Sequence, residues 1–328
     1  MGDMMETIRI EGLTKQFPSG WPGRPPATVL DGLSLSVRQG EIYGFLGPNG
    51  SGKTTTIKVL IGLIRATSGS VELLGKPVGD VPTRRRIGFL PESPYFYDYL
   101  TAEEFLMFYG HLAGMDRAGL AGRVSRLLEV VGLVEARTRQ LRKFSKGMLQ
   151  RVGLAQALIH DPELVILDEP MSGLDPIGRK QVRDLILGLR DQGKTVFFST
   201  HIIPDVEMIC DRVGVIVKGK LLATGRVDEL VNQGHTQSVE IACQGISVER
   251  IPAIQAMASR VVQRGSQSLI VLPGPAPLES ALAEIRKQGG TLISVTPHKS
   301  SLEELFFQSQ GQGQGQGSLA PARSAMGA

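Results

Sequence analysis

A short glycine-rich stretch places a lysine and a threonine where they could bind a phosphate group. Residues 47–54 read Gly-Pro-Asn-Gly-Ser-Gly-Lys-Thr and fit the pattern G-x-x-x-x-G-K-[ST]. Glycines let the backbone curl so that its N–H groups point at phosphate oxygens, and Lys53 would reach the β- and γ-phosphates of a nucleotide. Thr54 would hold Mg²⁺. The residues expected to contact the nucleotide here are Gly47, Pro48, Asn49, Gly50, Ser51, Gly52, Lys53, Thr54 and Thr55.

Two adjacent carboxylates follow a buried strand later in the chain. Residues 164–167 are the apolar run Leu-Val-Ile-Leu, and Asp168 and Glu169 come directly after it. A carboxylate at a strand end can help to hold Mg²⁺ beside Thr54, which makes Asp168 the candidate metal ligand. Glu169 could polarise a water molecule for attack on the γ-phosphate. Adjacent acids are common in loops, so the pair alone is weak evidence for a metal site. Together with the phosphate-binding loop it becomes strong evidence.

A third candidate site lies where a helix is predicted to begin. Ser145 precedes a helical pattern that continues to about residue 160. Ser145 could cap this helix, and Gly147 would leave the N–H groups of the first turn open to an anion. An ordinary capped helix would have the same pattern, so both interpretations stay open at this point.

The elements around these residues alternate between strands and helices, which predicts an α/β sheet. The phosphate-binding loop is preceded by a strand at 42–46 and followed by a helix at 55–63. Residues 7–17 are predicted to form an edge strand, and residues 101–160 have helical spacing with Thr101 as a cap. Further strands are predicted at 30–37, 71–74, 87–90, 164–167, 195–200, 213–217 and 220–223, and further helices at 179–192 and 202–210.

The composition changes near residues 232–235, where we place a domain boundary. The first domain would then span residues 5–232. Beyond the boundary, the order β-α-β-β-α-β predicts a small α+β ferredoxin-like domain over residues 236–307, closed by a short helix at 301–307. Residues 308–328 contain Gln-Gly repeats and are expected to be a disordered tail.

The bulk composition is that of a soluble globular protein with two domains. The chain has 328 residues, 41% hydrophobic and 21% charged, with a formal net charge of +4. That charge is spread along the chain, so we expect no nucleic acid partner. Cys210 and Cys243 have no metal-binding spacing and suit a reducing cytosol. We find neither a signal peptide pattern nor an apolar run of about 18 residues.

Taken together and in this order, the motifs resemble those of the nucleotide-binding subunit of an ATP-binding cassette (ABC) transporter. The resemblance covers about residues 7–230. Residues 47–54 match the Walker A loop, and Asp168 and Glu169 match Walker B and the catalytic glutamate. The resemblance implies a P-loop NTPase (ABC ATPase) domain with a helical subdomain at about 94–160, which binds and hydrolyses ATP with Mg²⁺.

The resemblance also assigns roles to residues that the motifs above do not explain. Asp175 matches the D-loop at the interface between cassettes, and His201 matches the switch histidine that hydrogen-bonds the γ-phosphate. Phe17 matches the aromatic residue that stacks on adenine, and Trp21 is the alternative. The family signature, which acts on the ATP of a second cassette, corresponds to Ser145, Lys146, Gly147 and Met148.

Two positions depart from the family pattern. Glu92 stands where the family usually has a glutamine that touches Mg²⁺ and the attacking water. A carboxylate can still bind the metal, so we expect Glu92 to keep this catalytic role with an altered Mg²⁺ dependence; the alternative is a surface acid in a loop. Lys146 replaces the first signature glycine, where it either adds charge toward phosphate or is solvated.

The partners implied by the resemblance are a second cassette and a membrane protein. Two cassettes, identical or paralogous, would pack head to tail around ATP. An integral-membrane permease subunit would dock on the helical segment, especially on the aromatic stretch at 95–99, and would hold the chain peripherally at the cytoplasmic face of the inner membrane. The C-terminal region, which ends in Ser-Leu-Glu-Glu-Leu-Phe at 301–306, resembles that of subunits serving ABC-2-type exporters.

Two other functions remain open at this stage. A soluble ABC ATPase of translation or DNA repair usually carries two cassettes or a long coiled-coil insertion, whereas this chain has one cassette and no heptad run. A regulatory cassette that does not hydrolyse ATP is disfavoured by the presence of Glu169 and His201.

Overall fold

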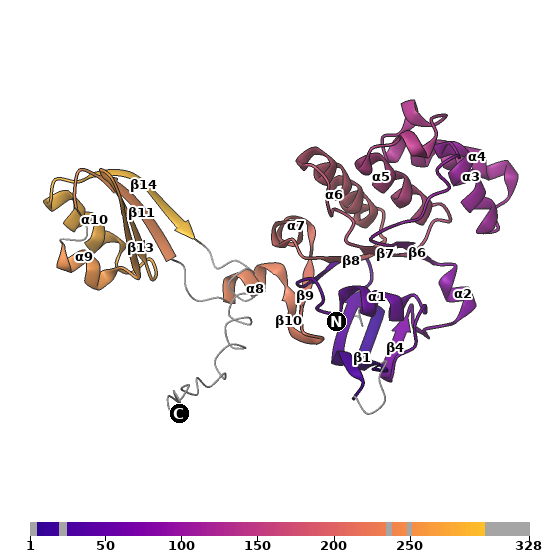
Figure 1. Cartoon of the computed structure of the whole chain (residues 1–328), viewed down its shortest axis with the longest axis horizontal. Coiled ribbons are helices and arrows are strands. Elements are labelled where there is room, and N and C mark those ends of the chain that lie inside the picture. The colour runs from indigo at the N-terminus through magenta and orange to yellow at the C-terminus, as the bar shows by residue number, and fades with distance from the viewer. Residues whose placement is uncertain (1–4, 20–24, 234–237, 248–250, 299–328) are drawn as a thin grey trace, which may run out of the picture. The chain divides into compact units, whose positions relative to one another are not determined.

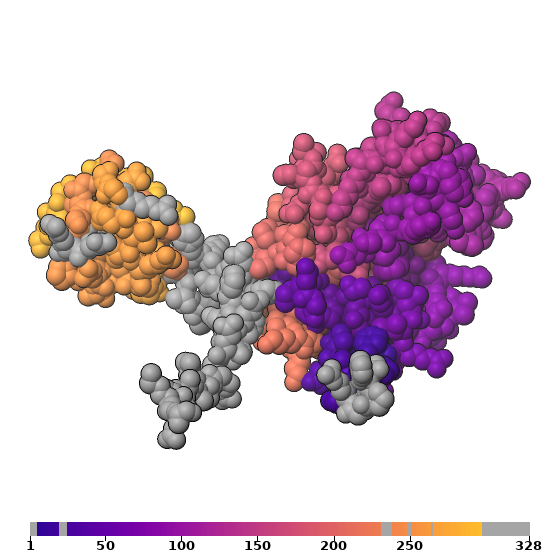
Figure 2. All heavy atoms as spheres, viewed as in Figure 1, coloured from indigo at the N-terminus to yellow at the C-terminus, as the bar shows by residue number. Residues whose placement is uncertain are grey.

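The chain folds into two compact units, Met1–Val227 and Asp228–Ala328, in a computed structural model. The structure describes residues 5–19, 25–233, 238–247 and 251–298. Figure 1 labels their helices and strands, and Figure 2 shows the same residues as spheres, coloured from indigo at the N-terminus to yellow near the C-terminus.

A six-stranded sheet carries the predicted chemistry of the first unit. Its strand order is β10-β9-β3-β8-β7-β6, and neighbouring strands are parallel except for the β9–β10 hairpin. The interior strands β7 and β8 are buried along their whole length, as their continuous apolar runs predict. The six strands are β3 (Ile42–Leu46), β6 (Ile87–Leu90), β7 (Leu164–Asp168), β8 (Thr195–Thr200), β9 (Arg212–Val217) and β10 (Lys220–Arg226).

An antiparallel sheet, β2-β1-β4-β5, forms the other layer of the first unit. The prediction of an edge strand at residues 7–17 was wrong, because β1 pairs with β2 on one side and with β4 on the other. Alternation of apolar and polar residues indicates that one face of the strand is buried. Edge strands and central strands can both have one buried face, so the pattern does not distinguish them. The strands are β1 (Glu6–Phe17), β2 (Ala27–Arg38), β4 (Ser68–Leu73) and the short β5 (Lys76–Pro77).

Helices cover the six-stranded sheet on both faces. Figure 1 shows α1 (Lys53–Leu60) between the two sheets, with α5 (Lys146–Ala157) and α6 (Pro176–Asp191) on the opposite face. A helical subdomain adds α3 (Ala102–Leu112) and α4 (Arg117–Val130) beside α5. Short elements complete this unit: α2 (Val81–Arg84), the 3-10 turns Val134–Ala136 and Leu141–Lys143, and α7 (Ile203–Ile209). Helix α8 (Val227–Gln233) begins at the last residue of the first unit and belongs otherwise to the second.

The helix boundaries follow local capping chemistry. Thr101 caps α3 as predicted, because its side chain accepts from the N–H of Glu104 while Glu104 accepts from the N–H of Thr101. Helix α1 begins two residues before the predicted start at residue 55, and α5 ends three residues before His160.

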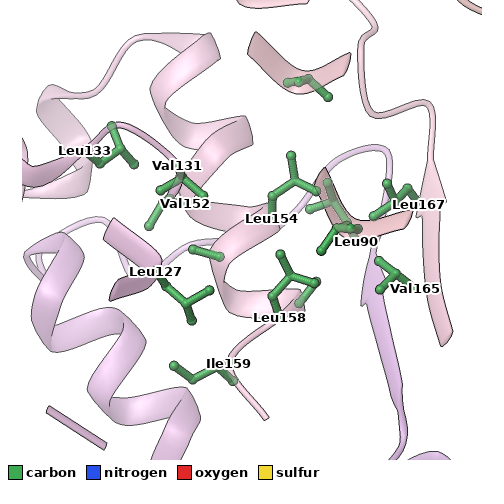
Figure 3. Close-up of a cluster of buried hydrophobic side chains, with 14 of the residues drawn as sticks. Leu90, Leu127, Val131, Leu133, Val152, Leu154, Leu158, Ile159, Val165 and Leu167 are labelled. Atoms are coloured by element: carbon green, nitrogen blue, oxygen red, sulfur yellow. The ribbon is translucent and has the colours of Figure 1, made fainter. Parts of the chain in front are cut away.

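A hydrophobic cluster fixes helix α5 against the sheet that carries Asp168. Figure 3 shows Leu154 of α5, and Leu158 directly after its C-terminal end, beside Leu90 of β6, with Leu167 of β7 on the far side. These side chains are buried, and their apolar surface is withdrawn from water. The C-terminal half of α5 is therefore packed against the sheet that contains β6 and β7.

The second unit is an antiparallel sheet with two helices packed on one face. Its strand order is β12-β13-β11-β14, and its core includes Ile241, Ile270 and Ile285. The elements in chain order are β11 (Ser238–Gln244), α9 (Pro252–Met257), β12 (Arg260–Arg264), β13 (Gln267–Leu272), α10 (Leu278–Lys287) and β14 (Thr291–His298). This is the β-α-β-β-α-β order of the predicted ferredoxin-like domain.

Two expectations for the C-terminus lie outside the described residues, namely the helix at 301–307 and the disordered tail at 308–328. Among the helices that the structure describes, none combines the length and the apolar character needed to cross a bilayer.

Candidate functional site

The loop between β3 and α1 has the tight curl that its glycines predict. Gly52 has φ +110° and caps α1, a conformation that other residues rarely adopt. At Gly47 a side chain has no room, because an added Cβ would lie 2.5 Å from the carbonyl oxygen of Ile216. The N–H of Gly47 donates to the carbonyl of Thr200 over 3.1 Å, which ties the loop to the end of β8.

The loop opens onto a cavity of about 270 Å³. The cavity brings Glu92 and Glu169 together with the predicted phosphate-binding residues, although these three segments lie far apart in the chain. Its lining residues are Val29, Asn49, Gly50, Gly52, Lys53, Thr54, Thr55, Glu92 and Glu169. Ser51 lies behind this lining, and its buried hydroxyl has no hydrogen-bond partner among the described residues.

Lys53 is held by oxygens of its own loop and by an acid from β7. Its Nζ donates to the carbonyls of Gly47 at 2.7 Å and Pro48 at 3.2 Å, and lies 3.2 Å from Oε1 of Glu169. The side chain is only 6% exposed, so its charge is compensated almost entirely by these oxygens. A phosphate group entering the cavity would compete for the same ammonium.

Glu169 is positioned between a lysine and a histidine. Its Oε2 lies 2.9 Å from Nδ1 of His201, and its Oε1 faces Lys53 in an ion pair without forming a hydrogen bond to any described residue. The backbone of Glu169 has φ +49°, and its N–H donates to Oγ of Ser199 at 3.0 Å. Because left-handed backbone is unfavourable for a glutamate, this hydrogen bond helps to fix the carboxylate in place.

Asp168 lies in a setting that favours a cation. Burial raises the pKa of this carboxyl, while hydrogen bonds from Ser199 and Thr54 lower it. Oγ of Ser199 donates to its Oδ1 over 2.6 Å. The hydroxyl of Thr54 thus lies beside Asp168, as the sequence predicts.

The donor set fits Mg²⁺ bound together with a nucleotide. Mg²⁺ takes one or two carboxylates and completes its shell with phosphate oxygens and water. Asp168 and Glu92 are the carboxylates available for this role, with the hydroxyl of Thr54.

The predicted signature lies at the N-terminus of α5 and does not line this cavity. Ser145 caps the helix by accepting from the N–H of Met148 at 3.3 Å. Met148 packs partly buried against the core of the helical subdomain. Lys146 lies across Gly173, where any side chain would collide with it. The geometry confirms the capped helix, and leaves its action on a second cassette as a prediction.

The other predicted residues are placed as follows. Asp175 caps α6, with its Oδ1 accepting from the N–H of Gly178 at 2.8 Å. Phe17 ends β1 with its ring 38% exposed, and Nζ of Lys15 lies 4.8 Å from the ring centroid. Phe17 is not among the residues that line the cavity, and Trp21 lies outside the described residues. The adenine-stacking residue therefore stays a prediction.

Sequence reasoning missed Ser199, which connects the two acids. A signal was present, because Ser199 ends a predicted buried strand next to His201, and the ends of adjacent parallel strands meet at one edge. Only the pairing of Asp168 with Ser199 across β7 and β8 makes the contact specific.

Comparison with known proteins gives this geometry its family. Residues 30–172 match the ABC transporter family model. The chain is 43% identical over 310 residues to an uncharacterized ABC transporter ATP-binding protein of Synechocystis sp.. The aligned region covers 93% of this chain and 84% of that relative. The chain belongs to the ABC transporter family. As an ATP-binding subunit of such a transporter, the cassette binds and hydrolyses ATP.

Two further likenesses agree with this assignment. The cassette protein is 35% identical to Nod factor export ATP-binding protein I of Cupriavidus metallidurans, over 86% of this chain and 92% of that relative. A solved ATP-binding subunit of an ABC transporter superposes with a TM-score of 0.60 at 31% identity, covering 69% of this chain and 92% of the other.

Proposed function

We propose that this chain powers export across a membrane, as one of two cassettes that close around ATP. The observation that carries the proposal is the separation of two half-sites within one chain. Lys53, Glu169 and Glu92 share one cavity, whereas Ser145 at the start of α5, the predicted anion site, lies outside it. A second copy or a paralogous cassette would supply the missing signature.

The residues of the cavity would act in a defined order. Lys53 turns from the carbonyls of Gly47 and Pro48 to the β- and γ-phosphates of ATP, which releases Glu169 from its ion pair. Glu169 then accepts a proton from a water molecule whose oxygen attacks the γ-phosphorus, and the bond to the β-phosphate oxygen breaks to leave ADP and phosphate. His201 orients Glu169 through the 2.9 Å contact and binds the γ-phosphate.

Asp168, Thr54 and Glu92 would hold Mg²⁺, which offsets the negative charge on the phosphate oxygens when it is bound. The buried position of Asp168 supports this role, since a buried carboxylate is stabilised by a nearby cation.

Glu169→Gln tests the hydrolytic part of the proposal. The variant should lose ATP turnover and accumulate as a dimer in MgATP, which light scattering after gel filtration would detect. Lys180→Gln changes an exposed side chain that has no assigned role in the site, and serves as the control. Turnover near the wild-type rate in Glu169→Gln would remove Glu169 as the base.

An aromatic surface of the helical subdomain is the proposed contact with the permease. Tyr95, Tyr97 and Tyr99 are 83%, 36% and 61% exposed, and Tyr97 packs edge-on against Phe108 at 5.5 Å. Exposed aromatic clusters are typical of protein interfaces. The prediction that Phe96 belongs to this surface was wrong, because Phe96 turns inward and packs on Phe105 at 5.4 Å.

Docking of a permease there would place the chain peripherally at the cytoplasmic face of a membrane. The likeness to a Nod factor export protein and the ferredoxin-like C-terminal unit support the export direction. Replacing Tyr95 and Tyr99 by serine should abolish co-purification with the membrane protein that the wild-type chain binds, while ATP binding is kept. A form bound to ribosomes or DNA would contradict the transport role.

A further inference from the structure

Two helices that lead away from the site are joined by a buried ion pair. Helix α6 follows the D-loop aspartate Asp175, and α7 begins two residues after His201. The helices pack side by side (Figure 1). Nη1 of Arg183 on α6 donates to Oδ1 of Asp205 on α7 over 3.1 Å, and the side chain of Asp205 is only 2% exposed.

The bonding at this junction is incomplete. Oδ2 of Asp205 is buried and has no hydrogen-bond partner among the described residues. On α6, Nε of Arg179 is also buried and without a described partner. Arg179 and Arg183 are four residues apart, so they share one face of α6 and lie about 6 Å apart along its axis.

An unpaired acceptor and an unpaired donor, both buried and of opposite charge, need an explanation, because such groups cost stability. Between α7 and α6, Oδ1 of Asp205 accepts a hydrogen bond from Arg183, whereas Oδ2 of Asp205 accepts none from the described residues. Nε of Arg179 likewise donates to no described residue. A shift of α7 along α6 by about one helical turn or less would exchange or share the carboxylate between the two arginines.

We infer that Arg179 is a second partner of Asp205, and that Asp205 engages Arg179 when His201 moves to contact the γ-phosphate of bound ATP. The inference rests on the proposed closure of two cassettes around ATP. Arg179 and Asp205 are then positioning residues, since neither lines the nucleotide cavity. They set the place of His201 relative to Asp175, and so link γ-phosphate binding to the surface that meets the second cassette.

The test compares three variants of α6. Arg179→Gln should leave the melting temperature of the nucleotide-free protein unchanged, because Nε of Arg179 makes no hydrogen bond in this state. Arg183→Gln should lower it, because the existing pair is broken. Lys180→Gln removes one exposed charge next to Arg179 and is the matched control.

With MgATP, Arg179→Gln should have a measurable effect, in contrast to its lack of effect on the nucleotide-free protein. In the Glu169→Gln background, Arg179→Gln should raise the ATP concentration for half-maximal dimerisation about fivefold or more, while Lys180→Gln leaves it unchanged. With Glu169 intact, Arg179→Gln should lower kcat with little change in KM. In a double-mutant cycle with Asp205→Asn, the effect of Arg179→Gln should vanish.

Two results would overturn the inference. One is an Arg179→Gln protein whose dimerisation and kcat match those of Lys180→Gln, which includes the case of a water molecule that satisfies both buried groups. The other is a fall in nucleotide-free melting temperature as large as that of Arg183→Gln, since Arg179 would then be part of the resting structure. If the Glu169→Gln protein fails to dimerise at all, the dimer proposal fails, and the kcat comparison alone decides the role of Arg179.

Discussion

Replacement of Ser199 by alanine tests whether one hydroxyl holds both acids of the site. Ser199 is fully buried, donates to Oδ1 of Asp168 at 2.6 Å and accepts from the N–H of Glu169 at 3.0 Å. The variant loses a hydrogen bond to a charged group and leaves a buried N–H unpaired. Each loss costs about 1–3 kcal/mol, so we expect the free energy of unfolding to fall by about 2–6 kcal/mol.

The sign of the pH dependence follows from Asp168. Its pKa in the folded protein is raised by burial, so the carboxyl favours folding at low pH and this contribution is lost as the pH rises through its folded pKa. Without the Ser199 hydrogen bond the pKa of Asp168 rises further. The stability difference between variant and wild type should therefore shrink as the pH is lowered through the folded pKa of Asp168.

Urea denaturation of the full chain, followed by circular dichroism, measures the stability change. ATP turnover should also fall at least tenfold, since the left-handed backbone of Glu169 loses its tether. Ser70→Ala is the control, because the hydroxyl of Ser70 is exposed and makes only a long hydrogen bond, 3.5 Å, to Oε2 of Glu11. A Ser199→Ala protein within 1 kcal/mol of the wild type, with normal turnover, would refute the reasoning.

Three other variants probe separate parts of the cassette. Thr101→Ala should destabilise the protein by about 1 kcal/mol in urea, because α3 loses its N-cap; a shift below the error of the measurement would contradict the cap assignment. Burial lowers the pKa of His160, which donates to the carbonyl of Ile87, so the neutral form favours folding and this contribution is lost as the pH falls below about 6.5. The unfolding free energy of the wild type should then fall more between pH 7.5 and 5.5 than that of His160→Gln. Glu92→Gln should keep ATP turnover but raise the Mg²⁺ concentration for half-maximal nucleotide binding, and an unchanged value would leave Glu92 without a metal role.

Several features follow from local chemistry, which explains why the sequence predicts them. The phosphate-binding loop needs left-handed backbone at Gly52, a local requirement that identifies this glycine without any knowledge of distant contacts. The crowding at Gly47, by contrast, comes from Ile216 and is set by the tertiary structure. Buried parallel strands need continuous apolar runs, and β7 and β8 have them. The cap at Thr101 and the order of elements in the second unit are likewise readable from short stretches.

Other features depend on which segments meet, and a single stretch of sequence does not contain that information. Whether β1 is central or at an edge is decided by β4, which pairs with it more than 50 residues later in the chain. Phe96 points inward because its ring packs on Phe105. The sequence does not predict this direction, because an irregular segment has no fixed alternation of inward and outward side chains.

The same division runs through the site. Sequence alone was enough to predict the residue types for handling phosphate, namely Lys53, Thr54, Asp168 and Glu169, because their chemistry and local spacing are sufficient for that prediction. Only the tertiary structure decided that Lys53 forms an ion pair with Glu169. It also decided that Ser199 hydrogen-bonds both the N–H of Glu169 and the carboxylate of Asp168. These contacts form where the ends of β3, β7 and β8 come together, because parallel strands place their carboxyl ends at one edge of a sheet.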